Sequence, residues 1–354
     1  LGTMRGLGDK TCFQATVETA LTMGINHLET APAYGNSEIY LGKILPTVPR
    51  SEFYLTSKFC PSPDPQVFIQ GLTNSLRRLQ VDYLDCLAIH GINTLEHWQW
   101  VQALYPVLEQ VKNQGLIRHL GFSTHATLPL VMEIIASGKF EFVNLHYYWF
   151  NQHLAPAIAL AAAQDMGIFI ISPADKGGQL HTPPHKLRAL CQPLTPLGLN
   201  YRFLLSDRRI TTLSLGAANP EELKEPLAYG DRLEPLSQEE QAIFQRLIDH
   251  QTATLGSQTC HQCYACLPCP EGINIPEILR LRNLAIAFDM TAFGQYRYRM
   301  LENAGHWFPG KRGDRCTDCG DCLPHCPHHL PIPDLLRDTH QRLQGKDRRR
   351  LWQD

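Results

Sequence analysis

The chain has 354 residues and a formal net charge of −2 at pH 7. This length exceeds the need of one small hydrophobic core, so we expect a large domain followed by a smaller one. A net charge near zero argues against nucleic acid as a partner, and no apolar run is long enough to cross a membrane. The sequence shows no basic, hydrophobic leader at its start, so we expect a cytoplasmic protein.

Short apolar runs alternate with amphipathic segments over the first 230 residues. Within 65–79, valine and leucine residues fall on one face of a predicted helix. Several apolar runs are nearly continuous, as in parallel strands that are buried on both faces. The count of units predicts an α/β fold of the (β/α)8 TIM barrel type over residues 1–235, with a doubly wound sheet as the main alternative. The predicted strands are 1–5, 25–30, 53–58, 83–89, 118–123, 142–146, 168–172 and 211–215, and the last helix is 221–229.

A second, mainly α-helical domain is predicted over residues 236–337. A polar helix is expected near 235–255, and another is expected at 276–289 between two cysteine-rich runs. Residues 338–354 are predicted to form a charged C-terminal tail. A solvated chain end explains these charges better than a nucleic-acid surface does.

Twelve cysteines are unusual in such a chain, and eight of them fall in two tight runs after residue 259. A chain with a large apolar core does not need disulfides, and tight clusters more often bind metal. The second run, CTDCGDCLPHCP, matches the bacterial ferredoxin pattern C-x2-C-x2-C-x3-C-P. The first run, CHQCYACLPCP, has only two residues before its fourth cysteine.

This spacing lets three thiolates of a run bind three corners of one four-iron cluster, while the fourth cysteine ligates the other cluster. We therefore predict two [4Fe–4S] clusters, with the assignment of Cys269 the most affected by the short spacing of its run. Four cysteines in C-x2-C pairs also suit tetrahedral zinc, which is the alternative. The long, helix-prone link between the runs resembles the α-helical ferredoxin module of several oxidoreductases. The predicted ligands are Cys260, Cys263, Cys266 and Cys326 for one cluster, and Cys316, Cys319, Cys322 and Cys269 for the other.

Four polar residues lie at or just after the ends of three successive predicted strands, where barrel enzymes carry their chemistry. They are Glu29, Tyr34, Lys58 and His90. A tyrosine alone is a poor acid or base because its pKa is about 10. A neighbouring lysine cation stabilises tyrosinate and should move this pKa toward neutrality, and the carboxylate can hold the lysine in place. A histidine can position a substrate carbonyl.

The segments LGTMR, ETAPAYG, SEIYLGKIL, LTSK, YLDCLAIHG, IRHLGFST, VNLHYYWFN, ISPADKGGQL and LGAANPEEL follow one another in the chain. Over roughly residues 1–230 the chain thereby resembles the aldo/keto reductase family, and as a whole it resembles the subfamily with a C-terminal ferredoxin-like domain. The resemblance implies that Tyr34 is the general acid–base, that Lys58 tunes it, that His90 orients the carbonyl and that Glu29 pairs with Lys58. The family usually has Asp at position 29, so the carboxylate here is one methylene further out.

The resemblance also implies a nicotinamide cofactor, NADP or NAD, across the barrel mouth. No Arg or Lys stands where the family often grips the 2′-phosphate after the eighth strand, which leaves a preference for NADPH open. The implied contacts are Ser123, Asn144 and Tyr148 near the nicotinamide, Ser172, Lys176 and Gly178 along the ribose and pyrophosphate, and Gly216, Asn219 and Glu222 near the adenosine.

Three functional hypotheses follow. In the first, the protein reduces a small aldehyde or ketone with NAD(P)H, and Tyr34 donates the proton. In the second, a ferredoxin-type donor protein feeds electrons through the clusters, and the barrel does not use a nicotinamide. In the third, the barrel is idle and the protein is an electron-transfer or docking module. Hydride transfer moves two electrons and a cluster passes one, and no flavin motif bridges the two.

Overall fold

The computed structural model describes residues 1–346. Two compact units make up the chain. The first contains Leu1–His181 and Asn200–Pro235, and the second contains Thr182–Leu199 and the described residues from Leu236 onward. The predicted domain boundary at residue 235 stays a prediction, but segment 182–199 lies in the second unit because α7 (His185–Cys191) packs on α10 (Gln238–Leu255).

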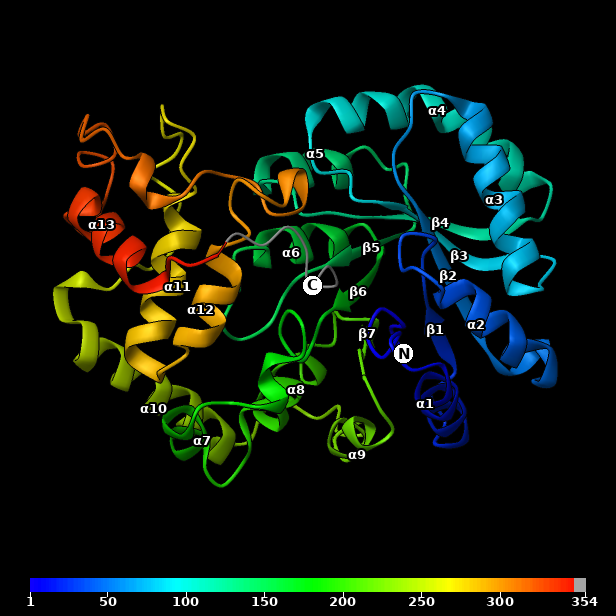
Figure 1. The fold of residues 1–354 in the computed structure, drawn as a ribbon, viewed down its shortest axis with the longest axis horizontal. Helices are drawn as coiled ribbons and strands as arrows, with labels where there is room; N and C mark the ends of the chain where they lie inside the picture. The colour runs from blue at the N-terminus through cyan, green and yellow to red at the C-terminus, as the bar shows by residue number, and fades with distance from the viewer. Residues whose placement is uncertain (347–354) are drawn as a thin grey trace. The chain divides into compact units, whose positions relative to one another are not determined.

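The first unit is built on seven parallel strands that pair in chain order (Figure 1). Residues 1–3 bond on both sides, because Glu29 donates to the Leu1 carbonyl at 2.8 Å and Gly2 donates to the Leu215 carbonyl at 2.6 Å. They therefore occupy the first strand position and bring the sheet to a nearly closed barrel, which confirms the predicted barrel and excludes an open sheet. The strands are β1 (His27–Glu29), β2 (Tyr54–Phe59), β3 (Leu84–His90), β4 (Ile117–Ser123), β5 (Phe142–Leu145), β6 (Gly167–Ile171) and β7 (Thr212–Ser214).

The predicted first strand, 1–5, is shorter than expected. It is a single bridge between Gly2 and Glu29, because pairing ends at Thr3 and Gly6 then takes a left-handed φ of +76°. The remaining seven predicted strands are present with small shifts at their ends. All four residues of β5 are buried, in keeping with a parallel strand that is covered on both faces.

Helices surround this sheet on its outer face (Figure 1). The predicted helix at 65–79 is α3, which begins with Pro65 behind an Asp64 cap and buries Phe68, Leu72 and Leu79. The helices of this part of the chain are α1 (Lys10–Thr22), α2 (Ser37–Ile44), α3 (Pro65–Leu79), α4 (Leu95–Asn113), α5 (Leu128–Ala136), α6 (Ala155–Ala163), α8 (Pro196–Leu205) and α9 (Glu221–Leu227), with 3-10 turns at Leu45–Thr47, Arg50–Glu52 and Gln179–His181.

The second unit is helical, as predicted. Its centre is α11 (Ile275–Phe288), which is buried over nearly its whole length and contacts α10, α12 (Thr291–Tyr298) and α13 (Ile332–Leu343). The buried charge of Arg280 on this helix is compensated, since Arg280 pairs with Glu277 at 2.7 Å. Further 3-10 turns lie at Gly256–Gln258, Gly305–Trp307 and Gly313–Arg315.

The predicted tail boundary at residue 338 is wrong, because α13 continues to Leu343. Thr339 and Leu343 on this helix are fully buried, so they belong to the packed unit. Residues 347–354 of the predicted tail lie outside the described residues. Within the described chain, no helix is both long and apolar enough to span a membrane.

Candidate active site and iron–sulfur sites

The four predicted catalytic residues meet at one end of the barrel. Glu29 and His90 are the last residues of β1 and β3, and Lys58 lies next to the end of β2. Tyr34 follows β1 in the loop that leads to α2. Because all the strands are parallel, these positions share the rim at the carboxyl ends of the strands.

Lys58 is the centre of the cluster. Its Nζ lies 2.8 Å from Glu29 Oε1 and donates to Tyr34 Oη at 3.3 Å. The rings of Tyr34 and His90 stand nearly perpendicular, with centroids 5.6 Å apart. The structure thus brings all four residues together, and the extra methylene of Glu29 does not prevent contact with Lys58.

The second oxygen of Glu29 is also held. Asn144 Nδ2, on β5, donates to Glu29 Oε2 at 2.7 Å across the barrel. The sequence suggested Asn144 only as a nicotinamide contact, and nothing in its spacing pointed to Glu29. Asn144 is fully buried, and among residues 1–346 its Oδ1 has no hydrogen-bond partner. An orphaned amide oxygen at the barrel mouth fits a ligand that carries an N–H donor.

Burial and the Glu29–Lys58 ion pair have opposite effects on the pKa values of this cluster. It would raise the pKa of Glu29, but the Lys58 ammonium outweighs it and holds that pKa below its usual range. Burial likewise opposes the charge of Lys58, yet Glu29 and Tyr34 together raise the Lys58 pKa. For Tyr34, burial raises the pKa more than the nearby ammonium lowers it. The expected net fall of the Tyr34 pKa toward neutrality is therefore wrong for this structure, although Lys58 acts in the expected direction.

Residues predicted near the nicotinamide follow the ends of neighbouring strands. Ser123 ends β4, and its Oγ accepts from the Gly91 amide at 3.0 Å, next to His90. Tyr148 is buried, and its backbone exchanges hydrogen bonds with Asn151.

The loop after β6 carries the residues predicted for the ribose and pyrophosphate. Ser172 has a left-handed φ of 59°, and Lys176 Nζ lies 2.9 Å from His146 Nε2. Gly178 also has a left-handed φ, of +74°.

The residues predicted for the adenosine gather around a side chain that the sequence did not single out. Arg5 donates to the Gly216 carbonyl at 2.7 Å and forms an ion pair with Glu222. Asn219 Oδ1 accepts from the Glu222 amide at 3.1 Å. Arg5 was missed because it lies 217 residues from Glu222.

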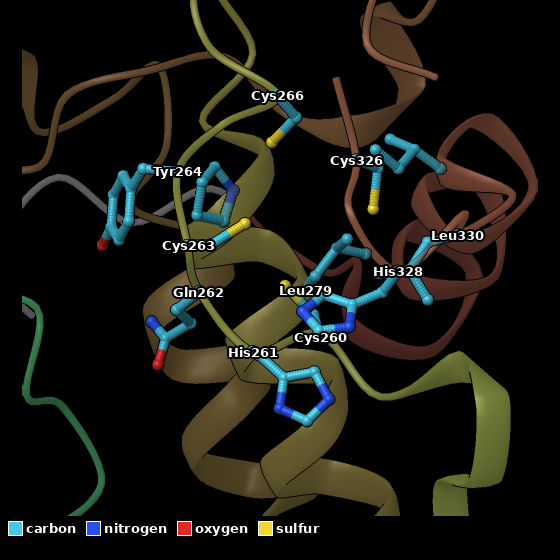
Figure 2. A pocket seen from close by; sticks show the side chains of 12 residues that line it. Cys260, His261, Gln262, Cys263, Tyr264, Cys266, Leu279, Cys326, His328 and Leu330 are labelled. Carbon is cyan, nitrogen blue, oxygen red and sulfur yellow. The ribbon is translucent and has the colours of Figure 1, made fainter. Parts of the chain in front are cut away.

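The second unit brings the cysteines together in two groups. Cys260, Cys263, Cys266 and Cys326 line one cavity, and Figure 2 shows the sulfurs of the last three directed toward a common space. Apolar side chains, among them Leu279 and Leu330, close the cavity. Cys326 comes from the second cysteine run, so this grouping crosses the runs.

The remaining four cysteines approach one another in the same crossed manner. Burial raises the pKa of the Cys322 thiol, and the nearby Cys316, Cys269 and Cys319 raise it further. In the first group, burial raises the pKa of Cys266 to about 12, and Cys260 and Cys263 add to this. No disulfide forms among the twelve cysteines, all of which lie in the described part of the chain. Clustered, partly buried thiols fit a metal group that binds them as thiolates.

Comparisons with known proteins agree with this architecture. Residues 1–181 match the model of the aldo/keto reductase family, and residues 259–330 match that of a 4Fe-4S dicluster domain. The chain is 27% identical to L-galactose dehydrogenase from Arabidopsis thaliana, over 65% of this chain and 81% of the relative. It is 31% identical to methylglyoxal reductase DkgB from Escherichia coli O157:H7, over 49% of this chain and 64% of that protein.

Solved structures show the same fold. Aldo-keto reductase AKR11C1 from Bacillus halodurans in its holo form aligns with a TM-score of 0.62 at 22% identity, over 70% of this chain and 90% of that one. An aldo-keto reductase from Klebsiella pneumoniae in complex with NADPH aligns with a TM-score of 0.58 at 20% identity, over 70% and 89%. With a barrel, a rim cluster and a family match over half its length, the chain belongs to the aldo/keto reductase family and carries a 4Fe-4S dicluster domain.

Proposed function

We propose that the protein reduces an aldehyde or ketone to the alcohol with a nicotinamide cofactor, and that Tyr34 supplies the proton. The observation that carries this proposal is the chain of contacts Glu29–Lys58–Tyr34, at 2.8 and 3.3 Å, in which Glu29 and Lys58 are buried. Membership of the aldo/keto reductase family supports it, and so does the likeness to the Klebsiella pneumoniae reductase, which was solved in complex with NADPH.

Tyr34 is suited to act as an acid. Its pKa is raised by burial, so the phenol keeps its proton at neutral pH and can donate it to a carbonyl oxygen. As the proton leaves, the Lys58 ammonium at 3.3 Å stabilises the tyrosinate. The bound nicotinamide would supply the hydride to the carbonyl carbon. Hydride and proton together convert the carbonyl to an alcohol.

The other residues hold this acid in place. Glu29 keeps Lys58 charged and is itself oriented by Asn144. The ring of His90 packs edge-on against Tyr34, where it can position the carbonyl oxygen at the same hydroxyl. The orphaned Oδ1 of Asn144 would accept from an amide N–H of the cofactor.

The cysteine groups are proposed to hold two [4Fe–4S] clusters. One would bind Cys260, Cys263, Cys266 and Cys326, and the other would bind Cys316, Cys319, Cys322 and Cys269. Such clusters pass single electrons. A second candidate function, electron exchange with a ferredoxin-type donor, is favoured by the exposed thiols of Cys263 and Cys319, which put one ligand of each group at the surface.

The test is a Tyr34→Phe variant of the anaerobically purified protein. NADH or NADPH oxidation would be recorded with a panel of small aldehydes and ketones, and the cluster absorbance would be followed in the same spectra. We expect turnover to fall by about 10²–10⁴-fold with the cluster band unchanged. Tyr54→Phe, at an exposed position at the other end of β2, is the matched control. Near-native turnover in Tyr34→Phe would remove Tyr34 from the mechanism, and no nucleotide oxidation by the native protein would favour the electron-transfer function.

A further inference from the structure

Arg5 lies between the loops that follow β6 and β7 at the barrel mouth. Its Nη1 lies 2.5 Å from Glu222 Oε2, and its Nη2 lies 3.1 Å from Glu222 Oε1, which is a bidentate contact. Nη1 also donates to the Gly216 carbonyl at 2.7 Å. A Cβ at Gly178, where φ is +74°, would lie 2.5 Å from Arg5 Nη1, so the Gly178 backbone passes close beside the guanidinium.

Glu222 is ionised in this arrangement. Burial alone would raise its pKa, but the Ala218 amide and the Arg5 guanidinium outweigh it and hold the pKa below its usual range. The Ala218 amide donates to Oε2 at 2.9 Å, and His181 Nε2 lies 3.6 Å from the same oxygen. The carboxylate offers roughly four acceptor positions, and Arg5 and Ala218 use three of them. One position on Oε1 remains for a further donor.

The Arg5–Glu222 ion pair lies at the loops that follow the last two strands of the barrel. Since residues 1–3 fill the first strand position, β6 and β7 occupy the seventh and eighth. TIM barrels frequently bind phosphate groups with the loops after these two strands. Here the guanidinium that faces both loops is already bound to a carboxylate of the same chain.

We propose that the Arg5–Glu222 ion pair makes this barrel select a dinucleotide without a 2′-phosphate, NADH over NADPH. The inference rests on the proposed use of a nicotinamide cofactor. A ribose hydroxyl can donate to the remaining position on Glu222 and leave the ion pair intact. In Rossmann folds an acidic residue that binds the ribose hydroxyls selects NAD, whereas an arginine accommodates the 2′-phosphate, and the same charge argument applies to Glu222.

A 2′-phosphate meets two obstacles at the same place. Its charge, roughly −1.5 to −2 near pH 7 for a phosphate monoester, is repelled by the ionised Glu222. To bind Arg5 it must displace Glu222, whose side chain is only 20% exposed and would lose its cation. Lys224 nearby is a weak substitute, because its side chain is 67% exposed and solvent and salt screen its attraction for a phosphate.

The test is calorimetric binding of NADH and NADPH to the full-length protein with its clusters in place. We expect the native protein to bind NADPH at least about tenfold more weakly than NADH. Glu222→Gln removes the repelling charge and loosens Arg5, and it should reduce that ratio by about tenfold or more. Glu221→Gln, one residue away and exposed, removes the same charge outside the contact and should leave the ratio unchanged.

Each other outcome overturns the inference in a recognisable way. Equal or tighter binding of NADPH by the native protein would overturn the discrimination while the proposed function stands. Equal shifts in Glu222→Gln and Glu221→Gln would reduce the effect to net charge and overturn the role of the pair. If neither nucleotide binds, the proposed function fails and the discrimination fails with it. If Glu222→Gln does not fold, the native ratio still tests the preference for NADH.

Discussion

Removing the charge of either Glu29 or Lys58 should strongly destabilise the barrel, because the other charge would remain buried without its partner. The two residues are 4% and 1% exposed, and their charged atoms lie 2.8 Å apart. At this distance, Coulomb's law with an effective dielectric constant of about 20 gives an attraction of about 6 kcal/mol. Both groups lost their water on folding, so desolvation offsets much of this attraction in the intact pair.

Lys58→Met or Glu29→Gln alone leaves one buried charge without its partner. Each single change should therefore lower the free energy of unfolding by about 3–5 kcal/mol. The double variant holds neither charge, so its loss should be smaller than the sum of the two by up to about 3 kcal/mol.

The measurement is amide hydrogen exchange on peptides from β1 to β3, because it reports the stability of the barrel unit separately from the second unit. A control pair is Glu221→Gln with Lys224→Met, whose exposed contact should contribute less than about 1 kcal/mol. Losses that add to within about 0.5 kcal/mol in the Glu29–Lys58 cycle would refute the coupling.

Two further predictions concern pH and iron. Burial lowers the pKa of His27 to about 4 from an ordinary value of 6.5. Between these pH values the unfolded chain binds more protons than the folded chain does. The free energy of unfolding should therefore be constant above pH 6.5 and fall by up to about 3 kcal/mol toward pH 4. His27→Gln should flatten this part of the profile in hydrogen exchange, and a flat native profile would contradict the assignment. Cys326→Ser should remove about half of the iron, because the crossed ligand sets make Cys326 a ligand of the first-run cluster only. Full iron content would contradict the crossing, and Cys191→Ser, a buried thiol outside both runs, is the control.

Local patterns made part of this structure predictable. The ends of β1, β2 and β3 could be placed from apolar runs, and Glu29, Lys58 and His90 then fell on one rim because parallel strands end together. The spacing of the cysteines is also a local pattern, so both cysteine runs could be recognised from the sequence.

Contacts between distant segments could not be read from the sequence. The Asn144–Glu29 bond joins residues 115 apart, and the Arg5–Glu222 pair joins residues 217 apart. Neither follows from periodicity, because each depends on how the barrel closes. The direction of the Tyr34 pKa shift could not be predicted either. Burial decides this direction, and burial is a property of the packed fold.

Removal of the clusters separates the two kinds of electron transfer that the chain could support. In the proposed reaction, a hydride from the nicotinamide and a proton from Tyr34 convert the carbonyl to the alcohol. No electron then remains for a cluster to accept or supply. Glu29, Tyr34, Lys58 and His90 all lie in the first unit, whereas every predicted cluster ligand lies in the second. We therefore expect protein depleted of iron by a chelator to keep its turnover with NADH to within about twofold.

The second unit should respond differently to the same treatment. The eight cysteines of the two runs lie outside its helices, and loss of the metal should leave partly buried thiols without a metal to bind and lower the helical circular dichroism of the chain. Cys319→Ser, which removes an exposed predicted ligand of the second-run cluster, provides a milder depletion for comparison. If depleted protein still binds the nucleotide but no longer turns over the carbonyl, the expectation that the clusters lie outside the hydride step would be wrong.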